Sequence, residues 1–325
     1  MKSFEMGGYL PLELNTRPLP WDTLPQKYVF EVNTGRTAIW VAIKSLGIKK
    51  LFLPYFYCPD VISTIEQSGV ETCFYHIDHE MLPREQIPDK ADTAVLLVDY
   101  YGLLSGKLRI LAEKYSKVIL DSAHAFFAQP VLREGVMNVY SLRKFLGVSD
   151  GALLIGKGIV KPDLEQDISF HRATHLFKCY ETGTNGAYEE NKFCERDLTG
   201  FKTMSALTHR LLCNADYKAI ASKRRRNAQL LEKKLSSIQG LNLLVEESSP
   251  YMYPLLLDHD IHKELVSRHI YIPYLWAPLL ESKWVGTIEN QYSRNVLALP
   301  VDQRYNEDDM ELLSEIVLEV HERNG

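Results

Sequence analysis

The sequence predicts an α/β fold, in which helices flank a mostly parallel sheet, followed by a small C-terminal α+β domain. From about residue 28 to residue 155, short apolar runs alternate with amphipathic stretches, which is the order of a strand-helix-strand fold. The runs TAVLLV and VIL are almost wholly aliphatic, which is typical of strands buried on both faces. A chain of 325 residues is long enough for one large and one small domain, and we place these at residues 1–215 and 216–325.

The elements of the large domain follow from the pattern in chain order. Strands are expected at KYVFEV, KKLFLP, VETCFYHID, TAVLLVDYY, KVILDSAHAF and ALLIG. Helices are expected at TAIWVAIKSLG, CPDVISTIEQSG and KLRILAEKY. Gly47 and Gly69 end the first two helices, where a residue with left-handed backbone commonly caps the C-terminus.

The second half of the sequence is less regular. Residues 157–203 are polar, and TGTNGAYEEN within them predicts a loop. Residues 204–238 predict one long helix, and we place the domain boundary inside it. From NLLVEESSPYMYPLLLD onward, the pattern predicts a strand, a helix at HKELVSRH, a second strand and a final helix at EDDMELLSEIVLEVHE.

Composition argues against several classes of protein. The net charge is −5, whereas nucleic-acid-binding domains carry a basic surface, so we expect the basic run 223–226 to be a solvated helix face. No apolar run approaches the roughly 20 residues that span a bilayer, and the N-terminal MKSFEMGGYLPLEL lacks the apolar core of a signal peptide. The five cysteines are irregularly spaced without a CxxC pair, so neither disulfides nor a metal site is expected. We therefore expect a soluble, cytoplasmic protein.

Polar residues that follow predicted strands are the first candidates for chemistry, because ligands of open α/β sheets bind beyond the carboxyl ends of the strands. Asp121 follows VIL directly, and a carboxylate there is costly unless something pairs with it. A helix cap or loop aspartate is the alternative. His124 could contact a cofactor oxygen or be an ordinary loop histidine. Lys144 lies between two apolar elements; desolvation would free its amine as a nucleophile towards an aldehyde, although most lone lysines lie at the surface.

Further segments offer contacts to an anion or a planar ring. NTGRT, residues 33–37, opens a helix with small residues whose backbone N–H groups could bind a phosphate, although a plain helix cap explains the pattern as well. The residues concerned are Gly35, Arg36 and Thr37. Ser141 and Arg143 could hold an anion. The aromatic strand exit PYFYCP, residues 54–59, could supply a ring that stacks on a heteroaromatic ligand; core packing is the alternative.

The order of these segments resembles one protein family. A phosphate-type helix start, an aromatic strand exit, Asp-x-x-His and Ser-x-x-Lys follow one another as in the DegT/DnrJ/EryC1/StrS sugar aminotransferases, which are fold-type I enzymes dependent on pyridoxal 5′-phosphate (PLP). VILDSAHAF and VYSLRKFLGVSDGALLI carry the resemblance most specifically, and NTGRTAIWVAIKSLG, FLPYFYCPDVISTIEQSGVETCFYHID and SRNVLALPVDQRYNEDDMELLSEIV support it. The sequence departs from the family in its short Ser-to-Lys spacing, in Ala152 at the second glycine, and in Cys58 at the ring-stacking position.

The resemblance implies a role for each candidate residue. Lys144 would bind the cofactor covalently and move the substrate proton, and Asp121 would pair with the pyridine nitrogen. His124 would approach the phenolic oxygen. The cofactor phosphate would be held by Gly35, Arg36, Thr37 and Ser141, and the ring would be covered by Tyr57 or Tyr55.

The resemblance also implies a reaction. The chain would transfer an amino group from an amino acid, with glutamate as the expected donor, to a nucleotide-linked keto sugar for amino-sugar and polysaccharide biosynthesis. It would form a homodimer with shared active sites, and residues 171–196 would reach the partner's site. We expect Trp276 and Arg294 to contact the substrate.

Three alternatives stay open at this point. The first is a regulatory PLP-fold protein without catalysis, against which the complete set Asp121, His124 and Lys144 argues. The second is a PLP enzyme acting on another substrate or by another reaction. A dehydratase of this group would have His in place of Lys144. The third is an unrelated nucleotide-binding domain, but no glycine fingerprint follows the first strand.

Overall fold

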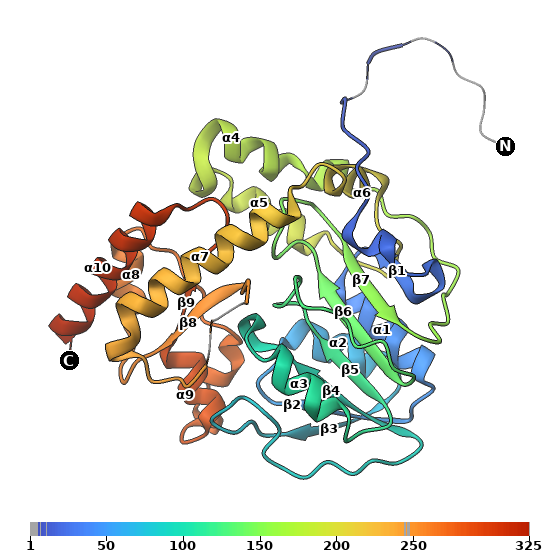
Figure 1. Cartoon of the computed structure of the whole chain (residues 1–325), viewed down its shortest axis with the longest axis horizontal. Coiled ribbons are helices and arrows are strands. Elements are labelled where there is room, and N and C mark those ends of the chain that lie inside the picture. Colours follow the sequence, from blue (N-terminus) through green and yellow to red (C-terminus); the bar gives the residue numbers. More distant parts are fainter. Residues whose placement is uncertain (1–5, 7, 11, 244, 246–247, 325) are drawn as a thin grey trace.

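The computed structural model describes residues 6–324 apart from 7, 11, 244, 246 and 247. A seven-stranded sheet forms the centre of the large domain, in the order β1–β7–β6–β5–β4–β2–β3 (Figure 1). Its strands are β1 (Val29–Val32), β2 (Lys50–Pro54), β3 (Glu71–Tyr75), β4 (Thr93–Val98), β5 (Val118–Asp121), β6 (Val136–Ser141) and β7 (Ala152–Gly156). Strands β2 to β6 pair in parallel, and β7 pairs antiparallel with both β6 and β1. The predicted mostly parallel sheet is confirmed.

Helices cover both faces of this sheet. Helices α1 (Gly35–Leu46) and α2 (Pro59–Gln67) lie on one face, and α3 (Ser105–Ala112) lies on the other (Figure 1). All six residues of β4 are buried, as its aliphatic sequence predicts for a strand covered on both sides. Gly47 caps α1 with a φ of 57°, which confirms the predicted left-handed helix end.

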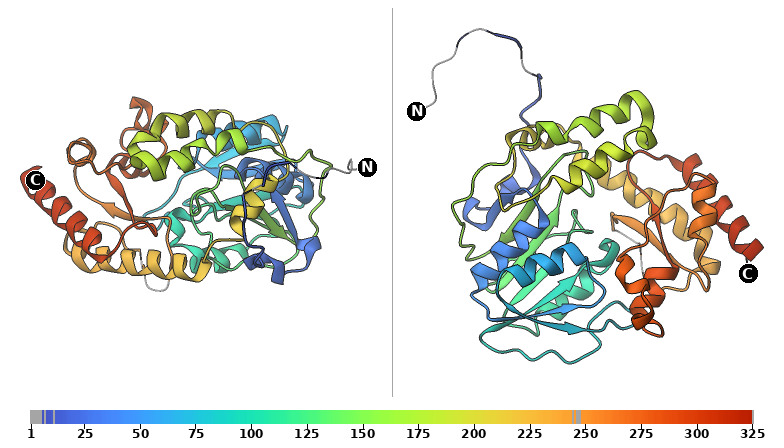
Figure 2. Two further views of the ribbon diagram at one scale, coloured as in Figure 1. Left: turned by 90° about the horizontal axis from the view of Figure 1, so that it is seen from above. Right: turned by 180° about the vertical axis from the view of Figure 1, so that it is seen from behind.

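The polar segment after β7 differs from its prediction. Within residues 157–203, helices α4 (Thr174–Gly186) and α5 (Tyr188–Arg196) form a hairpin that projects from the body of the molecule (Figures 1 and 2). The prediction of a loop at TGTNGAYEEN is therefore wrong. Gly183 has a φ of 74° and interrupts α4, and most residues of both helices are exposed. The polar composition of these helices and the glycines at 183 and 186 gave the segment the sequence character of a loop.

The predicted long helix is divided in two. Helix α6 (Ala206–Leu212) ends before Asn214, and α7 (Tyr217–Leu235) begins after Asp216. The Asp216 carboxylate accepts a hydrogen bond from Ala219 N, so this residue acts as the N-cap that starts α7. The predicted domain boundary, 215/216, falls in the connection between the two helices.

The C-terminal part has a hydrophobic core of its own. Strands β8 (Met252–Leu256) and β9 (Val296–Pro300) pair antiparallel, beside α8 (His262–Ser267), α9 (Ile288–Asn295) and α10 (Glu307–Asn324). Helix α10 packs against α7, and their buried side chains share one cluster with those of the two strands. The sequence pattern did not predict α9, which is short and polar. None of the helices in the described ranges is long and apolar enough to cross a bilayer.

The sequence led us to expect that the basic run on α7, residues 223–226, is a solvated helix face. The structure shows that one of its residues is buried. Arg224 is 2% exposed. Its Nη1 donates to the carbonyls of Pro250 (3.2 Å) and Tyr251 (3.0 Å), and its Nε donates to Gln303 Oε1 (3.0 Å). The guanidinium also lies 4.6 Å from the ring centroid of Phe145. Helical spacing puts position 224 on the same face as the core residues four and seven positions later, so the expectation is wrong for this arginine.

Replacement of Arg224 by Met is therefore expected to lower the free energy of unfolding by about 3–5 kcal/mol, because one buried and two partly buried acceptors lose their donor. Urea denaturation of the variant measures this loss. Arg226, which is 68% exposed and pairs with Glu307, supplies the matched control, since Arg226→Met removes an exposed ion pair worth at most about 1 kcal/mol. Equal losses in both variants would contradict the structural role of Arg224.

Candidate active site

The predicted site residues gather at one edge of the large sheet. Asp121 is the last residue of β5, and Ser141 is the last residue of β6. Strand β1 runs parallel to β6 because both are antiparallel to β7, so the start of α1 after β1 lies at this same edge. Gly151 N donates to Asn33 O at 2.6 Å and joins the end of β1 to the start of β7. The carboxyl ends of the strands thus form the crevice in which α/β sheets bind ligands.

Lys144 and His124 are in direct contact. Lys144 Nζ lies 2.7 Å from His124 Nε2. On the other side of the ring, the Tyr101 backbone N–H donates to His124 Nδ1 at 3.3 Å. A backbone N–H can only donate, so Nδ1 accepts and the proton of the neutral ring is on Nε2. That proton points at Nζ, and Lys144 must therefore accept it as a free amine.

The electrostatic surroundings favour the same protonation states. Burial lowers the pKa of His124 well below 6.5, and a positive charge on Lys144 would lower it further. Desolvation by burial also lowers the pKa of Lys144, with Asp121 acting in the opposite direction. A free amine is the form of a lysine that attacks a carbonyl and takes up a proton. The contact between the two side chains was not predicted from the sequence.

Asp121 is buried and held by two donors. Its Oδ1 accepts from Ala123 N at 2.9 Å, and its Oδ2 accepts from the Tyr57 hydroxyl. Burial raises the pKa of Asp121, and the hydrogen bonds from Tyr57 and Ala123 and the charge of Lys144 lower it. Burial and the neighbouring Asp121 raise the pKa of Tyr57 well above its usual value, so the phenol stays protonated and donates. The carboxylate is thereby fixed in orientation beside the lysine.

The three rings of the aromatic strand exit point to different places. Tyr55 packs against Phe74, with ring centroids 5.0 Å apart. Phe56 packs edge-on against Trp276 at 4.3 Å. Within the described part of the chain, Tyr57 is the ring of this segment that hydrogen-bonds Asp121. Tyr57 therefore reaches the predicted site, through its hydroxyl group.

Positive groups gather at the start of α1. Val139 packs in the core beneath α1 and Tyr140 packs on the opposite face, so alternation along β6 directs Ser141 to the α1 side. Arg143 Nη2 lies 3.5 Å from Glu195 Oε1. Its Nε is shielded from solvent and has no hydrogen-bond partner among the described residues.

Charged groups around Arg143 make the region at the start of α1 electropositive. Burial lowers the pKa of Arg143, and the nearby charges of Arg36 and Arg172 lower it further, against Glu195. Arg36 donates to Leu198 O at 2.6 Å. The first N–H groups of α1 have no partners within the helix. Together these donors make a region in which an anion is stabilised.

Thr37 differs from the other predicted phosphate contacts. Its backbone N–H donates to the Thr34 hydroxyl at 3.0 Å, and its own hydroxyl donates to Asn33 Oδ1 at 2.6 Å. Thr34 is thus the N-cap of α1. Both polar groups of Thr37 are engaged in this cap, which leaves the N–H groups of Gly35 and Arg36 at the helix start.

Residues far along the chain complete the site. The ring of Tyr251 stacks on His124 with centroids 4.8 Å apart, and Lys144 Nζ lies 5.2 Å from its centroid. Trp276, which we predicted as a substrate contact, lies parallel to His124 at 6.2 Å. Arg294, predicted for the same role, is exposed on α9. No local sequence pattern marks Tyr251, whose position depends on Arg224 and on its own N–H bond to Tyr101 O (2.9 Å).

A second buried carboxylate, Asp99, follows β4 near the site. Asp99 Oδ1 accepts from Leu104 N at 2.8 Å, and Oδ2 accepts from the Ser105 hydroxyl. Burial raises the pKa of Asp99 from 3.8 to about 6, against these two hydrogen bonds. When the pKa of a carboxyl is higher in the folded protein than in the unfolded chain, the folded state binds the proton more tightly. The group then contributes fully to the free energy of unfolding below its unfolded pKa, and this contribution is lost as the pH rises through the folded pKa.

The Asp99→Asn variant has no carboxyl that titrates at this position. The difference in stability between the variant and the wild type should therefore reveal the titration of Asp99. Between about pH 4 and about pH 8, its free energy of unfolding should rise by about 3 kcal/mol relative to the wild type, from a pKa shift of about two units. Urea denaturation of both proteins at several pH values measures the difference. Parallel pH profiles would show that Asp99 keeps an ordinary pKa.

Comparisons with known proteins concern the whole chain. No protein-family model matches the sequence, and no curated protein matches it. Solved structures do match. A DegT DnrJ EryC1 StrS aminotransferase from Brucella abortus is 14% identical, with a TM-score of 0.60 over 90% of this chain and 86% of that one. The sugar aminotransferase CalS13 from Micromonospora echinospora is 15% identical, with a TM-score of 0.60 over 89% and 86%.

A third structure was solved with a cofactor form. NtdA from Bacillus subtilis, with bound cofactor PMP, is 15% identical, with a TM-score of 0.61 over 91% of this chain and 73% of that one. At such identities the likeness concerns the backbone arrangement. The chain, with its mostly parallel seven-stranded sheet, therefore shares the fold of these aminotransferase structures.

Proposed function

We propose that the chain is a PLP-dependent aminotransferase that moves an amino group from an amino acid to a keto sugar. The observation that carries this proposal is the Lys144–His124 contact of 2.7 Å, with the buried Asp121 beside it. A free lysine amine and a fixed carboxylate at the carboxyl edge of this fold are the two groups on which PLP chemistry depends. The likeness to a structure solved with PMP supports the choice of cofactor.

The residues present fit such a cofactor. Asp121 would pair with the pyridine nitrogen, and His124 would lie near the phenolic oxygen, with Lys144 next to it. The unpartnered, shielded Nε of Arg143 is the observation that favours an anion here, because a buried donor left without an acceptor is costly. The phosphate would be held by the N–H groups of Gly35 and Arg36 and by Ser141 and Arg143, whereas Thr37, whose polar groups are engaged in the cap of α1, would support the helix start.

Each side chain has a defined task in the proposed reaction. When bound, the cofactor supplies a sink for the electron pair that remains after the substrate's α-proton leaves. Lys144 would carry the proton between the substrate carbon and the cofactor, away from the donor carbon in the first half-reaction and towards the acceptor carbon in the second. His124 would orient Nζ through its Nε2–H and keep it uncharged. Asp121, held by Tyr57 and Ala123 N, would stabilise positive charge on the pyridine nitrogen.

The acceptor we propose is a nucleotide-linked keto sugar, and the donor we propose is glutamate. The resemblance of VILDSAHAF and VYSLRKFLGVSDGALLI to sugar aminotransferases supports the sugar, as does the likeness to CalS13. Trp276 would offer a flat, half-buried surface to this substrate beside His124. An aromatic face against a sugar ring or a base contributes apolar contact without demanding one hydroxyl pattern.

We further propose a homodimer in which the α4–α5 hairpin contacts the partner. The hairpin exposes large aromatic side chains, which monomeric proteins rarely gather on one element. They are Phe177 (56% exposed), Tyr180 (93%), Tyr188 (55%) and Phe193 (63%). Light scattering should give the mass of a dimer, and Tyr180→Glu should shift it towards the monomer. A monomeric wild-type protein would refute this assembly.

The experiment that tests the function is an absorbance titration with PLP. We expect a visible band that borohydride reduction makes permanent. Addition of glutamate should convert the band to that of the aminated cofactor, and a panel of nucleotide-linked keto sugars should restore it. Absence of the band in excess PLP would refute the proposal. A band that no amino acid converts would instead indicate a regulatory PLP-binding protein.

A further inference from the structure

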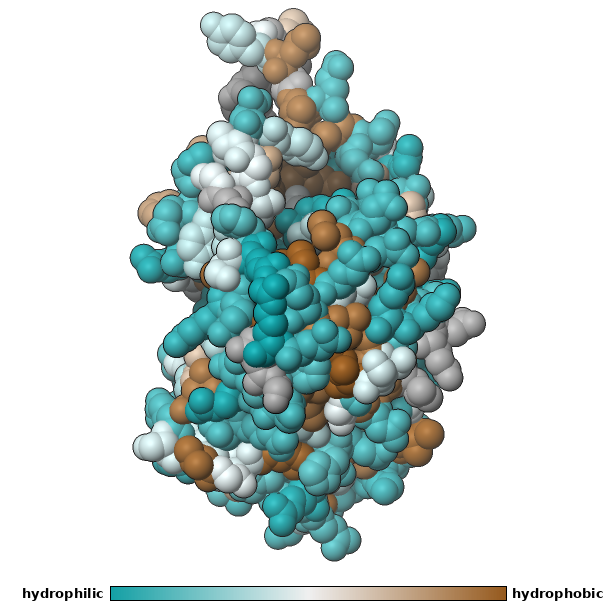
Figure 3. All heavy atoms as spheres, turned by 90° about the vertical axis from the view of Figure 1, so that its left-hand side faces the viewer, coloured by the Kyte–Doolittle hydropathy of each residue, from teal (hydrophilic) through white to brown (hydrophobic). Residues whose placement is uncertain are grey.

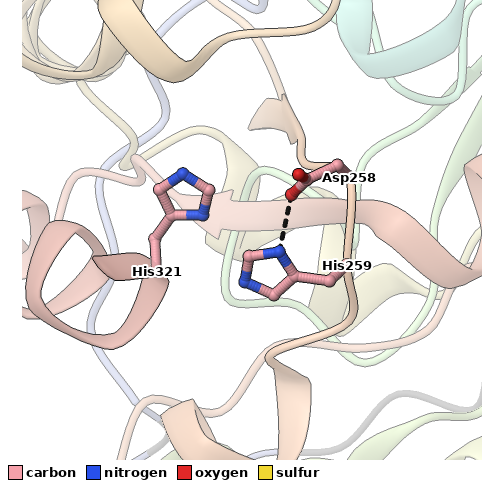
Figure 4. Close-up of side chains that lie close together, drawn as sticks. All are labelled: Asp258, His259 and His321. Atoms are coloured by element: carbon pink, nitrogen blue, oxygen red, sulfur yellow. Dashed lines mark hydrogen bonds and ion pairs between the residues drawn. The ribbon is translucent and has the colours of Figure 1, made fainter. Parts of the chain in front are cut away.

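Three metal-binding side chains meet in the small domain, away from the crevice at the edge of the large sheet. Asp258 and His259 follow β8, and His321 lies near the end of α10. Their side chains point towards one another from these two elements (Figure 4). One ligand atom from each of the three residues lies within 4.8 Å of the other two. An ion pair between Arg268 and Glu319 at 3.1 Å joins α8 to α10 nearby.

The two imidazoles carry nitrogen atoms without partners. His259 Nδ1 lies 2.5 Å from Asp258 Oδ1. His259 Nε2 and His321 Nδ1 are shielded from solvent, and neither has a hydrogen-bond partner among the described residues. Shielded polar atoms without partners are uncommon in proteins and call for an explanation. A metal ion explains the His321 atom, because a neutral imidazole nitrogen is a common metal ligand.

We propose that Asp258, His259 and His321 bind a divalent transition-metal ion, with zinc as the best match. Two imidazole nitrogens and one carboxylate oxygen form a ligand set that suits zinc, whereas calcium and magnesium prefer oxygen ligands alone. Asp258 is 81% exposed, so a water molecule can complete the coordination. The ion would connect the segment after β8 to the last helix and stabilise the small domain.

Binding requires a small movement of one ring. The planes of the His259 and His321 rings are 5° apart, with centroids separated by 4.9 Å. Because a ring nitrogen binds a metal in the plane of its ring, one imidazole has to turn about its Cβ–Cγ bond. His259 is 23% exposed, and we propose that this ring is the one that turns. The surface on the side that carries α10 is mostly hydrophilic, and hydrophobic atoms are visible chiefly near the middle of this face (Figure 3).

Calorimetric titration with zinc tests this site in the whole chain of 325 residues, after a chelator has removed any bound metal. We expect one equivalent to bind and the melting temperature to rise. His259→Ala and His321→Ala should each weaken binding at least about 10-fold, while His79→Ala, an exposed histidine of the large domain, should bind as the wild type does. Folding of each variant is checked by circular dichroism. His321→Gln is a milder second variant.

Cobalt gives a readout that reports on the ligands themselves. Cobalt(II) bound at this site should show the ligand-field absorption of a low-coordinate nitrogen-oxygen site, and His321→Gln should lose it. The proposal is overturned if zinc does not bind near stoichiometrically. It is equally overturned if both histidine variants bind as tightly as the wild type, or if magnesium competes equally. Because the readout is metal binding, the result is independent of the proposed aminotransferase activity.

Discussion

Replacing Lys144 with alanine is expected to reduce transamination by more than about 10³-fold, because one side chain supplies both the covalent attachment and the proton transfer. The methyl group can neither bind the cofactor carbonyl nor carry the proton. His124 loses the partner of its Nε2–H, which lies 2.7 Å from Nζ in the wild type. The variant should still bind the cofactor reversibly, since the groups proposed for the phosphate and the pyridine nitrogen are unchanged. Because the variant has no amine at position 144 to form the covalent bond that borohydride reduces, borohydride should fix no cofactor to the protein.

The control for this variant is Lys114→Ala, which removes an exposed lysine that follows α3. It should keep the wild-type rate and the borohydride-stable band. Mass spectrometry of the reduced wild-type protein should place the cofactor on the peptide that contains Lys144. Cofactor found on another lysine, or normal turnover by Lys144→Ala, would show that the site is elsewhere.

Asp121→Asn is expected to reduce transamination by about 10²–10⁴-fold, which is the range for loss of a preorganised charge at the reacting group. The wild-type carboxylate accepts from Ala123 N and from the Tyr57 hydroxyl, so its charge is directed at a fixed point. A neutral amide cannot hold positive charge on the pyridine nitrogen. Its NH₂ group must also face one of these two donors or the cofactor.

Stopped-flow absorbance of the half-reaction with glutamate measures this effect separately from cofactor binding. The rate constant at saturating glutamate should fall far more than the affinity for PLP. Asp163→Asn, on an exposed residue after β7, should leave both unchanged. A variant that turns over at the wild-type rate would exclude Asp121 from the role that we propose.

Much of the large domain could be predicted from the sequence, because its signals are local. The aliphatic runs of β4 and β5 require burial on both faces, and this indicates a covered sheet with parallel strands. Gly47 marks the end of α1 because its φ of 57° is costly for other residues. Asp121 follows a predicted strand, and the carboxyl ends of parallel strands meet at one edge, although the strand β6 that ends at Ser141 was not predicted. The neighbourhood of the candidate residues follows from these local facts.

Other features depend on contacts between distant segments. The sequence alone did not predict the α4–α5 hairpin, since its helices are polar and glycines at 183 and 186 within α4 indicate a loop. Arg224 resembles its solvated neighbours in the sequence, yet it is buried because the helical period turns it towards Pro250 and Tyr251. The same segment brings the Tyr251 ring onto His124. No local pattern encodes such a meeting.

The sequence by itself determined the large-domain strands other than β6, the end of α1 and the order of Asp121, His124 and Lys144, because these follow from local periodicity and backbone preferences. The tertiary structure decided the protonation state of the site. His124 is a donor towards Lys144 because the Tyr101 backbone N–H occupies its other nitrogen. The tertiary structure also brings His321 to Asp258 and His259, which lie about 60 residues earlier in the sequence. Both the protonation of the Lys144–His124 pair and the grouping of the three side chains depend on contacts between distant segments, and these contacts form only when the chain folds.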